Sequence, residues 1–191
     1  VEEVVYHFKN DKRFTEIILA GHSQGSLIAM MALKNVDKYI SIAGAGDTID
    51  KIIIQQITTQ SAEFGKITEA HFKELKETGE IKEVNPNLIS IFAKPNLPFW
   101  VSWAKLNPIR EIKEVKIPTL IINGDKDLQV KIANAQKLKE AKPSAELVII
   151  KNMNHILKDI TKDEDNLKSY SSADFPISEE LIKTVVTFVK K

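Results

Sequence analysis

The segment Gly21-His22-Ser23-Gln24-Gly25 has the residue types and spacing most suited to chemistry in this sequence. The apolar run 17–20 precedes it and is typical of a strand buried in a parallel sheet, and the apolar spacing of residues 26–33 is typical of a helix. A serine at the apex of such a strand–turn–helix unit is typical of a nucleophile elbow, in which the hydroxyl is exposed above the sheet. We therefore predict that Ser23 is a nucleophile, the alternative being a serine that caps a glycine turn.

The neighbours of Ser23 fit the same interpretation. We expect Gly21 and Gly25 to be glycines because the turn is tight and a Cβ at either position would crowd the adjacent strand or helix. The helix that follows would point its backbone N–H groups, and the positive end of its dipole, at the place where an oxyanion forms during acyl transfer.

A serine nucleophile needs a base within hydrogen-bond reach, and the chain has four histidines. His155 directly follows the last predicted strand, so we expect it at the carboxyl edge of the sheet, where Ser23 also lies. His7 lies in the first predicted helix and His71 in a separate insertion, and His22 is expected to point away from the hydroxyl of Ser23. We therefore predict that His155 is the base.

The base needs an acid to orient it, and two aspartates are candidates. Asp125 and Asp127 both follow the predicted strand 119–123, at the same edge of the sheet. An aspartate just after a strand commonly caps a turn, and we assign that role to Asp125. Asp127 is then the acid, with Asp125 as the alternative, and the chain order is Ser23, Asp127, His155.

Strand and helix patterns alternate along most of the chain, which predicts parallel βαβ units and an α/β fold. Four short apolar runs are typical of buried strands: 17–20, 39–43, 119–123 and 147–150. Helical spacing is found at 1–8, 26–33, 132–141 and after Ser178. Residues 162–172 are polar enough for a mobile surface loop. We expect the four strands to be neighbours in one sheet.

Residues 47–115 do not fit that alternation, and we interpret them as a helical insertion placed over one end of the sheet. Three apolar faces with helical spacing lie within it, and the second helix is expected to begin at Thr68. Trp100 and Trp103 belong to an aromatic patch among prolines; they are either core residues or candidate residues of a pocket wall. The predicted parts of the chain are 1–46, 47–115 and 116–191.

Composition excludes several classes of protein and site. The chain has no cysteine, which removes disulfides, thiolate nucleophiles and cysteine-ligated metals. Basic and acidic residues number 27 and 26, and only Arg13 and Arg110 among the basic ones are arginine, so a nucleic-acid surface is poorly supplied. No apolar run approaches the roughly 18 residues of a membrane span. We expect no metal, no cofactor, no nucleic acid and no membrane span.

The sequence resembles, over its whole length, the C-terminal two-thirds of an α/β-hydrolase-fold serine hydrolase. The resemblance is carried by the GHSQG segment, by residues 117–130 (IPTLIINGDKDLQV) and by residues 152–155 (NMNH) ahead of a final helix. It is most similar to bacterial carboxylesterases and serine-aminopeptidase-like hydrolases with a helical lid after the sixth strand. In that group the acid ends a Gly-x-x-Asp stretch, which implies Asp127, and the first oxyanion donor is the backbone N–H after the nucleophile, which implies Gln24.

The resemblance also implies what this sequence lacks. Only strands equivalent to the fifth to eighth of the fold are found, so we expect a fragment that lacks about 100 residues and the loop that supplies a second oxyanion donor. The strand at 17–20 would then have an open edge, which predicts an aggregation-prone or dimeric chain. The sequence starts at Val1, and an export signal could be lost with the missing part, so the cytoplasm is only the default location.

A small-molecule carboxylic ester with a small to medium acyl group is the expected substrate, because the insertion is rich in isoleucine and aromatic residues. The chain would cleave it through an acyl-enzyme intermediate on Ser23. A peptidase, a thioesterase or an acyltransferase would use the same three side chains, so these activities stay open. The other alternative is a hydrolase-like binding protein, or an inactive fragment, without turnover.

Overall fold

Four parallel strands form one sheet in the computed structural model, which describes residues 1–191. Every residue of the third strand is buried, as expected for a strand covered on both faces, whereas the first strand has a neighbour on one side only. The predicted strands, and their arrangement as neighbours, are therefore confirmed. In their order across the sheet they are β1 (Ile18–His22), β2 (Lys38–Ile42), β3 (Thr119–Gly124) and β4 (Glu146–Ile150).

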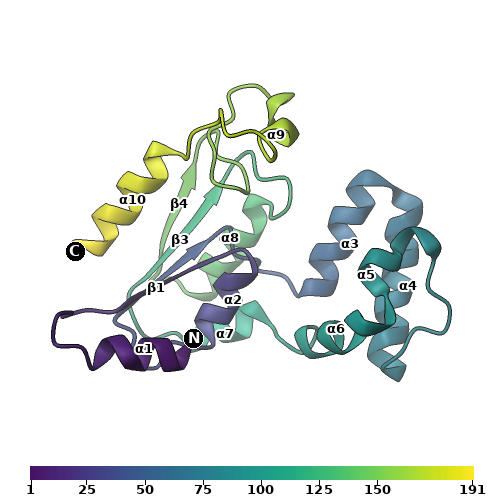
Figure 1. Cartoon of the computed structure of the whole chain (residues 1–191), viewed down its shortest axis with the longest axis horizontal. Helices are drawn as coiled ribbons and strands as arrows, with labels where there is room; N and C mark the ends of the chain where they lie inside the picture. Colours follow the sequence, from purple (N-terminus) through teal and green to yellow (C-terminus); the bar gives the residue numbers. More distant parts are fainter. The chain divides into compact units, whose positions relative to one another are not determined.

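Helices cover both faces of this sheet (Figure 1). Leu120 and Ile122 of β3 pack with Leu181 and Phe188 of the C-terminal helix on one face. Ile121 lies between Leu120 and Ile122 in the sequence and is fully buried. Because successive side chains of a strand point to opposite faces, Ile121 faces the helices on the other side of the sheet. The helices of this part of the chain are α1 (Glu2–Lys9), α2 (Gln24–Met30), α7 (Pro108–Glu114), α8 (Ile132–Ala141), α9 (Asp165–Lys168) and α10 (Glu179–Val189).

The chain divides into two compact units, residues 1–46 with 108–191, and residues 47–107. The first contains the sheet, and the second corresponds to the expected insertion but ends before residue 115. The difference is helix α7, which packs against α2 and α8 and buries Ile112 completely. An amphipathic helix belongs to the unit that covers its apolar face, so the expected boundary at 115 is wrong by one short helix.

The second unit, which we call the helical unit, has an apolar core of its own. Its helix α4 starts at Ala62 because the hydroxyl of Ser61 accepts a hydrogen bond from the N–H of Phe64. The start expected at Thr68 is wrong, since the hydroxyl of Thr68 donates to the carbonyl of Phe64 inside the helix. The elements of the unit are α3 (Ile49–Gln60), α4 (Ala62–Thr78), η1 (Pro86–Leu88), α5 (Ile89–Phe92), η2 (Lys94–Asn96) and α6 (Leu97–Trp103).

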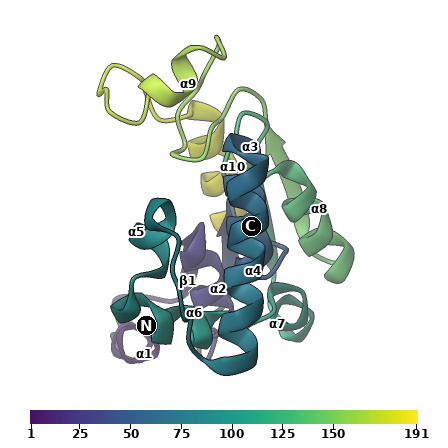
Figure 2. The same ribbon diagram turned by 90° about the vertical axis from the view of Figure 1, so that its right-hand side faces the viewer.

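The segment predicted to be a mobile loop, residues 162–172, contains helix α9 and lies beyond the carboxyl ends of β3 and β4 (Figure 1 and Figure 2). Asn166 and Ser169 in this segment are buried. Buried polar side chains need hydrogen-bond partners, and both residues have them. A free surface loop is therefore the wrong description for these two residues.

Helix α1 forms where it is predicted but buries little of its apolar face. Val5 is its one buried residue, whereas Val4 is 59% exposed and Phe8 is 40% exposed. The helical spacing of the apolar residues thus predicted the element correctly and its burial incorrectly. None of the helices of the chain combines the length and the apolar character that a membrane-spanning segment needs.

Candidate active site

Ser23 lies at the turn between β1 and α2 with a strained backbone. Its φ and ψ are 54° and −122°, a positive-φ conformation that residues with a side chain rarely adopt. Such a conformation costs about 1–3 kcal/mol and is found mostly at functional sites. The N–H of Ser23 donates to the carbonyl of Ile42 on β2, 2.9 Å away, which holds the turn against the sheet. The strand, the strained apex and the helix together have the form of a nucleophile elbow.

Only one of the two glycines beside Ser23 is required by lack of space. A Cβ on Gly21 would lie 2.2 Å from the carbonyl oxygen of Gly25, far inside contact distance. A Cβ on Gly25 would have no atom within 4 Å outside its own helix, and the φ of Gly25 is not positive. The expected crowding is therefore confirmed for Gly21 and wrong for Gly25, because the position that a Cβ would occupy on Gly25 is open space.

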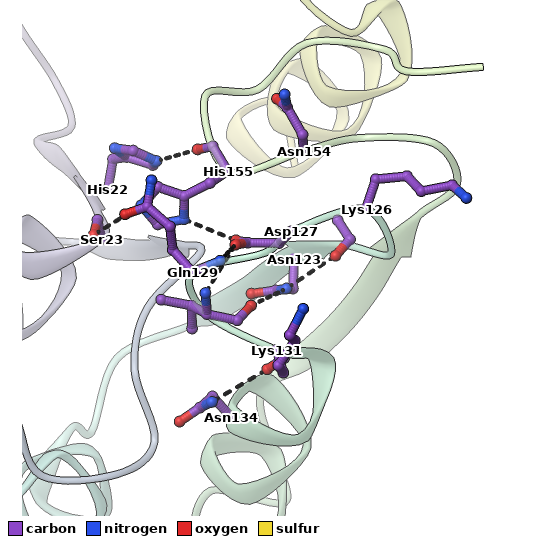
Figure 3. Close-up of polar contacts among 12 residues, drawn as sticks. His22, Ser23, Asn123, Lys126, Asp127, Gln129, Lys131, Asn134, Asn154 and His155 are labelled. Carbon is purple, nitrogen blue, oxygen red and sulfur yellow. Dashed lines mark hydrogen bonds and ion pairs between the residues drawn. The ribbon is translucent and has the colours of Figure 1, made fainter. Parts of the chain in front are cut away.

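The ring of His155 lies between Ser23 and Asp127 (Figure 3). Its Nε2 is 3.1 Å from Oγ of Ser23, and its Nδ1 is 2.8 Å from Oδ2 of Asp127. Since a carboxylate can only accept, Nδ1 carries the proton, and Nε2 of the neutral ring is left to accept from the hydroxyl of Ser23. This is the tautomer that a general base acting on Ser23 needs.

Asp127 is oriented by the backbone of its own turn. Its Oδ1 accepts hydrogen bonds from the N–H groups of Gln129 and Val130, both at 2.8 Å, which leaves Oδ2 for His155. Asp127 and His155 are both buried, and the loss of surrounding water strengthens the hydrogen bond between them. Asp125, the alternative acid, bonds to a backbone N–H in another turn and not to the ring of His155.

His22 contacts the main chain of His155. It forms no hydrogen bond with Ser23, but its Nε2 lies 2.7 Å from the carbonyl oxygen of His155, and the two rings are 4.9 Å apart. A carbonyl only accepts, so Nε2 of His22 carries the proton. Part of the side chain is exposed, yet partial burial of the ring lowers the pKa of His22 below the ordinary value for histidine. No pattern in the sequence indicates this contact.

A buried polar network holds the turn that carries His155. The side chain of Asn154 is fully buried, and its Nδ2 donates to the hydroxyl of Ser169, 2.8 Å away. The side chain of Asn166 donates to the carbonyl of Lys126, 2.7 Å away, in the turn that also holds the aspartate. Residues 162–172, which we call the α9 segment, thus support both the turn that carries His155 and the turn that carries Asp127. No local pattern in the sequence marks these residues, because they have no periodicity and only Asn154 is next to a residue of chemical interest.

The backbone N–H of Gln24 begins helix α2 and has no carbonyl partner in the chain. It follows Ser23 directly, at the position that the resemblance implies for the first oxyanion donor. The N–H of Ser26, by contrast, donates to the carbonyl of Ser23, 3.0 Å away. A free N–H beside the hydroxyl of Ser23 can donate to a negatively charged oxygen that forms there.

Trp100 and Trp103 stack on each other in α6, with ring centroids 5.9 Å apart and an interplanar angle of 3°. Nε1 of Trp100 donates to the carbonyl of Ile91, 2.8 Å away, and the ring packs against the core of the helical unit. A cavity of about 610 Å³ in this unit is lined by residues such as Phe92 and Val101 and by neither tryptophan. Trp100 therefore has a packing role, and a pocket role for the two tryptophans stays a prediction.

Comparison with models of known protein families finds no match, and no curated protein is similar in sequence. Solved structures are similar in fold. An esterase from Pyrococcus furiosus matches with a TM-score of 0.60 and 18% identity, over 97% of this chain and 58% of that one. An esterase from Exiguobacterium antarcticum matches with a TM-score of 0.53 and 19% identity, over 99% of this chain and 70% of that one. A bromoperoxidase from Bacillus anthracis matches with a TM-score of 0.54 and 15% identity, over 100% of this chain and 73% of that one.

These similarities concern the fold alone, because the identities are below 20%. The chain spans 58% of the length of the esterase from Pyrococcus furiosus. The shared part comprises nearly all of this chain, including the four-stranded parallel sheet and the helices that flank it.

Proposed function

Since the chain has the α/β-hydrolase fold, we propose that it is the core of a serine hydrolase that cleaves carboxylic esters through an acyl-enzyme intermediate. The observation that carries the proposal is the alignment of three side chains, in which the ring of His155 is 3.1 Å from Ser23 and 2.8 Å from Asp127. Two of the structures compared above are described as esterases, which supports ester cleavage.

In the proposed acylation, Oγ of Ser23 attacks the carbonyl carbon of the ester while Nε2 of His155 takes the hydroxyl proton. The carboxylate of Asp127 keeps the ring oriented and stabilises the imidazolium that forms. The N–H of Gln24 donates to the oxyanion of the tetrahedral intermediate. The alcohol then leaves with the proton from His155, and the acyl group stays on Ser23.

Deacylation uses water in place of the serine hydroxyl. His155 takes a proton from the water, whose oxygen attacks the acyl carbonyl, and collapse of the intermediate returns a proton to Oγ of Ser23 as the carboxylic acid leaves. The hydrogen bond from Nδ1 to Asp127 keeps Nε2 unprotonated at the start of both steps, so no change of tautomer is needed between them.

The proposed substrate has a small to medium acyl group. The core of the helical unit combines isoleucines with aromatic rings, which supports an uncharged acyl chain over a bulky charged group. We assign to this unit the role of a lid, and to Trp100 and Trp103 the role of candidate pocket residues.

Labelling with a fluorophosphonate tests the proposed nucleophile, because this probe forms a covalent adduct with an activated serine. We expect one adduct, on the peptide that contains Ser23, and no adduct after Ser23→Ala. Ser102→Ala is the matched control, since Ser102 is an exposed serine of the helical unit and its loss should leave labelling unchanged. A folded chain without an adduct on Ser23, or labelling that survives Ser23→Ala, contradicts the proposal.

A substrate panel then distinguishes the reactions that share these three side chains. p-Nitrophenyl esters with acyl chains of increasing length are compared with aminoacyl amides and with thioesters. We expect kcat/KM to be highest for esters of short or medium acyl chains. A preference for amides or thioesters would replace the esterase proposal with a peptidase or a thioesterase, and labelling without any turnover would indicate a binding protein.

A further inference from the structure

We propose that His22 is a positioning residue that ties the nucleophile elbow to the turn of His155; the proposal rests on the function proposed for Ser23 and His155. The ring Nε2 of His22 donates a hydrogen bond to the carbonyl oxygen of His155, 2.7 Å away (Figure 3). The acceptor is the main chain of the residue whose ring serves as base. The bond therefore fixes the place from which that ring reaches toward Ser23.

The donor of this hydrogen bond, His22, is held by the sheet. His22 is the last residue of β1 and is paired with Ile42 of β2. The next residue, Ser23, also bonds to Ile42 through its N–H. Side chains that start from a strand are held more precisely than those that start from a loop. The donor on His22 and the hydroxyl of Ser23 thus share one rigid support.

The acceptor of this hydrogen bond, the carbonyl of His155, lies in irregular backbone. Residues 151–158 form neither helix nor strand, and Asn152 and Leu157 have φ values of 64° and 67°. The side chain of Asn154 anchors this turn to Ser169, on the side of the α9 segment. His22 anchors the carbonyl of His155 on the side of the elbow. A turn held from two sides leaves the base little freedom to move away from the nucleophile.

A neutral ring is suited to this task. The centroid of the His22 ring is 4.9 Å from that of His155, and the charged groups that face it are His155, when protonated, and Asp127. Partial burial lowers the pKa of His22 and so favours the uncharged form of its ring. A positive charge at that distance would oppose protonation of His155, which the reaction requires. An uncharged His22 can therefore position His155 without placing a second positive charge beside the imidazolium.

Two substitutions of His22 distinguish the effect of losing the hydrogen bond from the effect of changing the size of the side chain. His22→Phe keeps a ring and removes the donor, whereas His22→Gln keeps an amide N–H that can reach the same carbonyl. His7→Phe is the matched control, because His7 is exposed on α1. For fluorophosphonate labelling of Ser23, we expect His22→Phe to lower the maximal rate constant about 10–100-fold and to leave the half-saturating probe concentration unchanged. His22→Gln and His7→Phe should stay within about threefold of the wild type.

Amide hydrogen exchange tests the hydrogen bond between His22 and His155 without requiring catalytic activity. We expect the amides of residues 152–158 to exchange faster in His22→Phe than in the wild type, His22→Gln or His7→Phe, with no change in global stability. Unchanged exchange in this segment for His22→Phe would overturn the proposal, and so would an equal loss of labelling in His22→Phe and His22→Gln. If Ser23 of the wild type is not labelled at all, the proposed function fails, and the exchange comparison alone decides whether His22 holds the turn.

Discussion

The carboxylate of Asp125 accepts a hydrogen bond from the backbone N–H of Asn152, 2.6 Å away, and so joins the turn after β3 to the turn that carries His155. Asp127, two residues later, binds the ring of His155 directly. The two aspartates act on the same turn in different ways: Asp125 holds its main chain, and Asp127 holds the ring.

Asparagine substitutions should separate these two roles. We expect Asp127→Asn to lower the rate of Ser23 labelling about 10⁴-fold, because an amide nitrogen can donate to Nδ1 and favour the wrong tautomer of His155. Asp125→Asn keeps an oxygen that can accept from Asn152, so its rate should fall by less than about tenfold. Fluorophosphonate labelling measures both rates. A larger loss in Asp125→Asn would show that the acid had been assigned to the wrong aspartate.

Alanine at the two glycines of the elbow should have opposite consequences. Gly21→Ala puts a Cβ 2.2 Å from a backbone oxygen that cannot move without the turn, so we expect a loss of at least about 3 kcal/mol in the free energy of unfolding, or no folding. Gly25→Ala enters open space in the first turn of α2 and gains up to about 1 kcal/mol of helix propensity. Urea unfolding followed by circular dichroism compares them. Equal destabilisation by both would be incompatible with the described elbow.

His71 should make the stability of the helical unit depend on pH. Its Nε2 accepts a hydrogen bond from the N–H of Asn85, 3.1 Å away, and burial lowers the pKa of His71. Below the unfolded histidine pKa of about 6.5, the unfolded chain therefore binds more protons than the folded chain. We expect the contribution of His71 to the free energy of unfolding to fall as the pH decreases from about 6.5 to the lower folded-state pKa, and to level off below it.

Tryptophan fluorescence can measure this pH dependence, because both tryptophans of the chain, Trp100 and Trp103, belong to the helical unit. Urea unfolding followed by their fluorescence, between about pH 7.5 and about pH 5, reports the stability of this unit. His71→Gln removes the titrating ring and keeps an oxygen that can accept from Asn85, so its pH dependence should be shallower than that of the wild type. If the free energy of unfolding changes with pH in the same way in the wild type and in His71→Gln, another group is responsible for the pH dependence.

The open edge of β1 should cause self-association. β1 pairs with β2 along one side and has no strand on the other, so its outward N–H and C=O groups are available to a second chain. We expect the sedimentation coefficient to rise with concentration in the wild type. Ala20→Lys places a charge at an exposed position of β1 and should reduce the rise. A single species of 21.5 kDa at all concentrations would count against this expectation.

Local patterns predicted most of the elements, and they placed Ser23 in a strand–turn–helix unit. Buried apolar runs and helical spacing depend on neighbours in the sequence, and the strands and the helix Ile132–Ala141 form where those patterns predict them. The elbow is also local, because Gly21, Ser23 and the following helix belong to one continuous turn. In a parallel sheet all carboxyl ends lie at one edge, so the strand pattern placed Ser23 and His155 at the same edge. β1 and β4 are the outer strands of the sheet, so the contact between the two side chains depends on the path of the turn after β4.

The tertiary structure decided which side chains meet at that edge. Asp125 and Asp127 follow the same strand, and only the path of the turn directs one of them to the ring of His155. The contact of His22 with His155, and that of Asn166 with the turn of the aspartate, join residues far apart in the chain and have no local pattern. The sequence alone determined the chemistry available, because that depends on residue types and short spacing. The hydrogen bonds among these side chains required the tertiary structure, because a hydrogen bond depends on positions within a few tenths of an ångström.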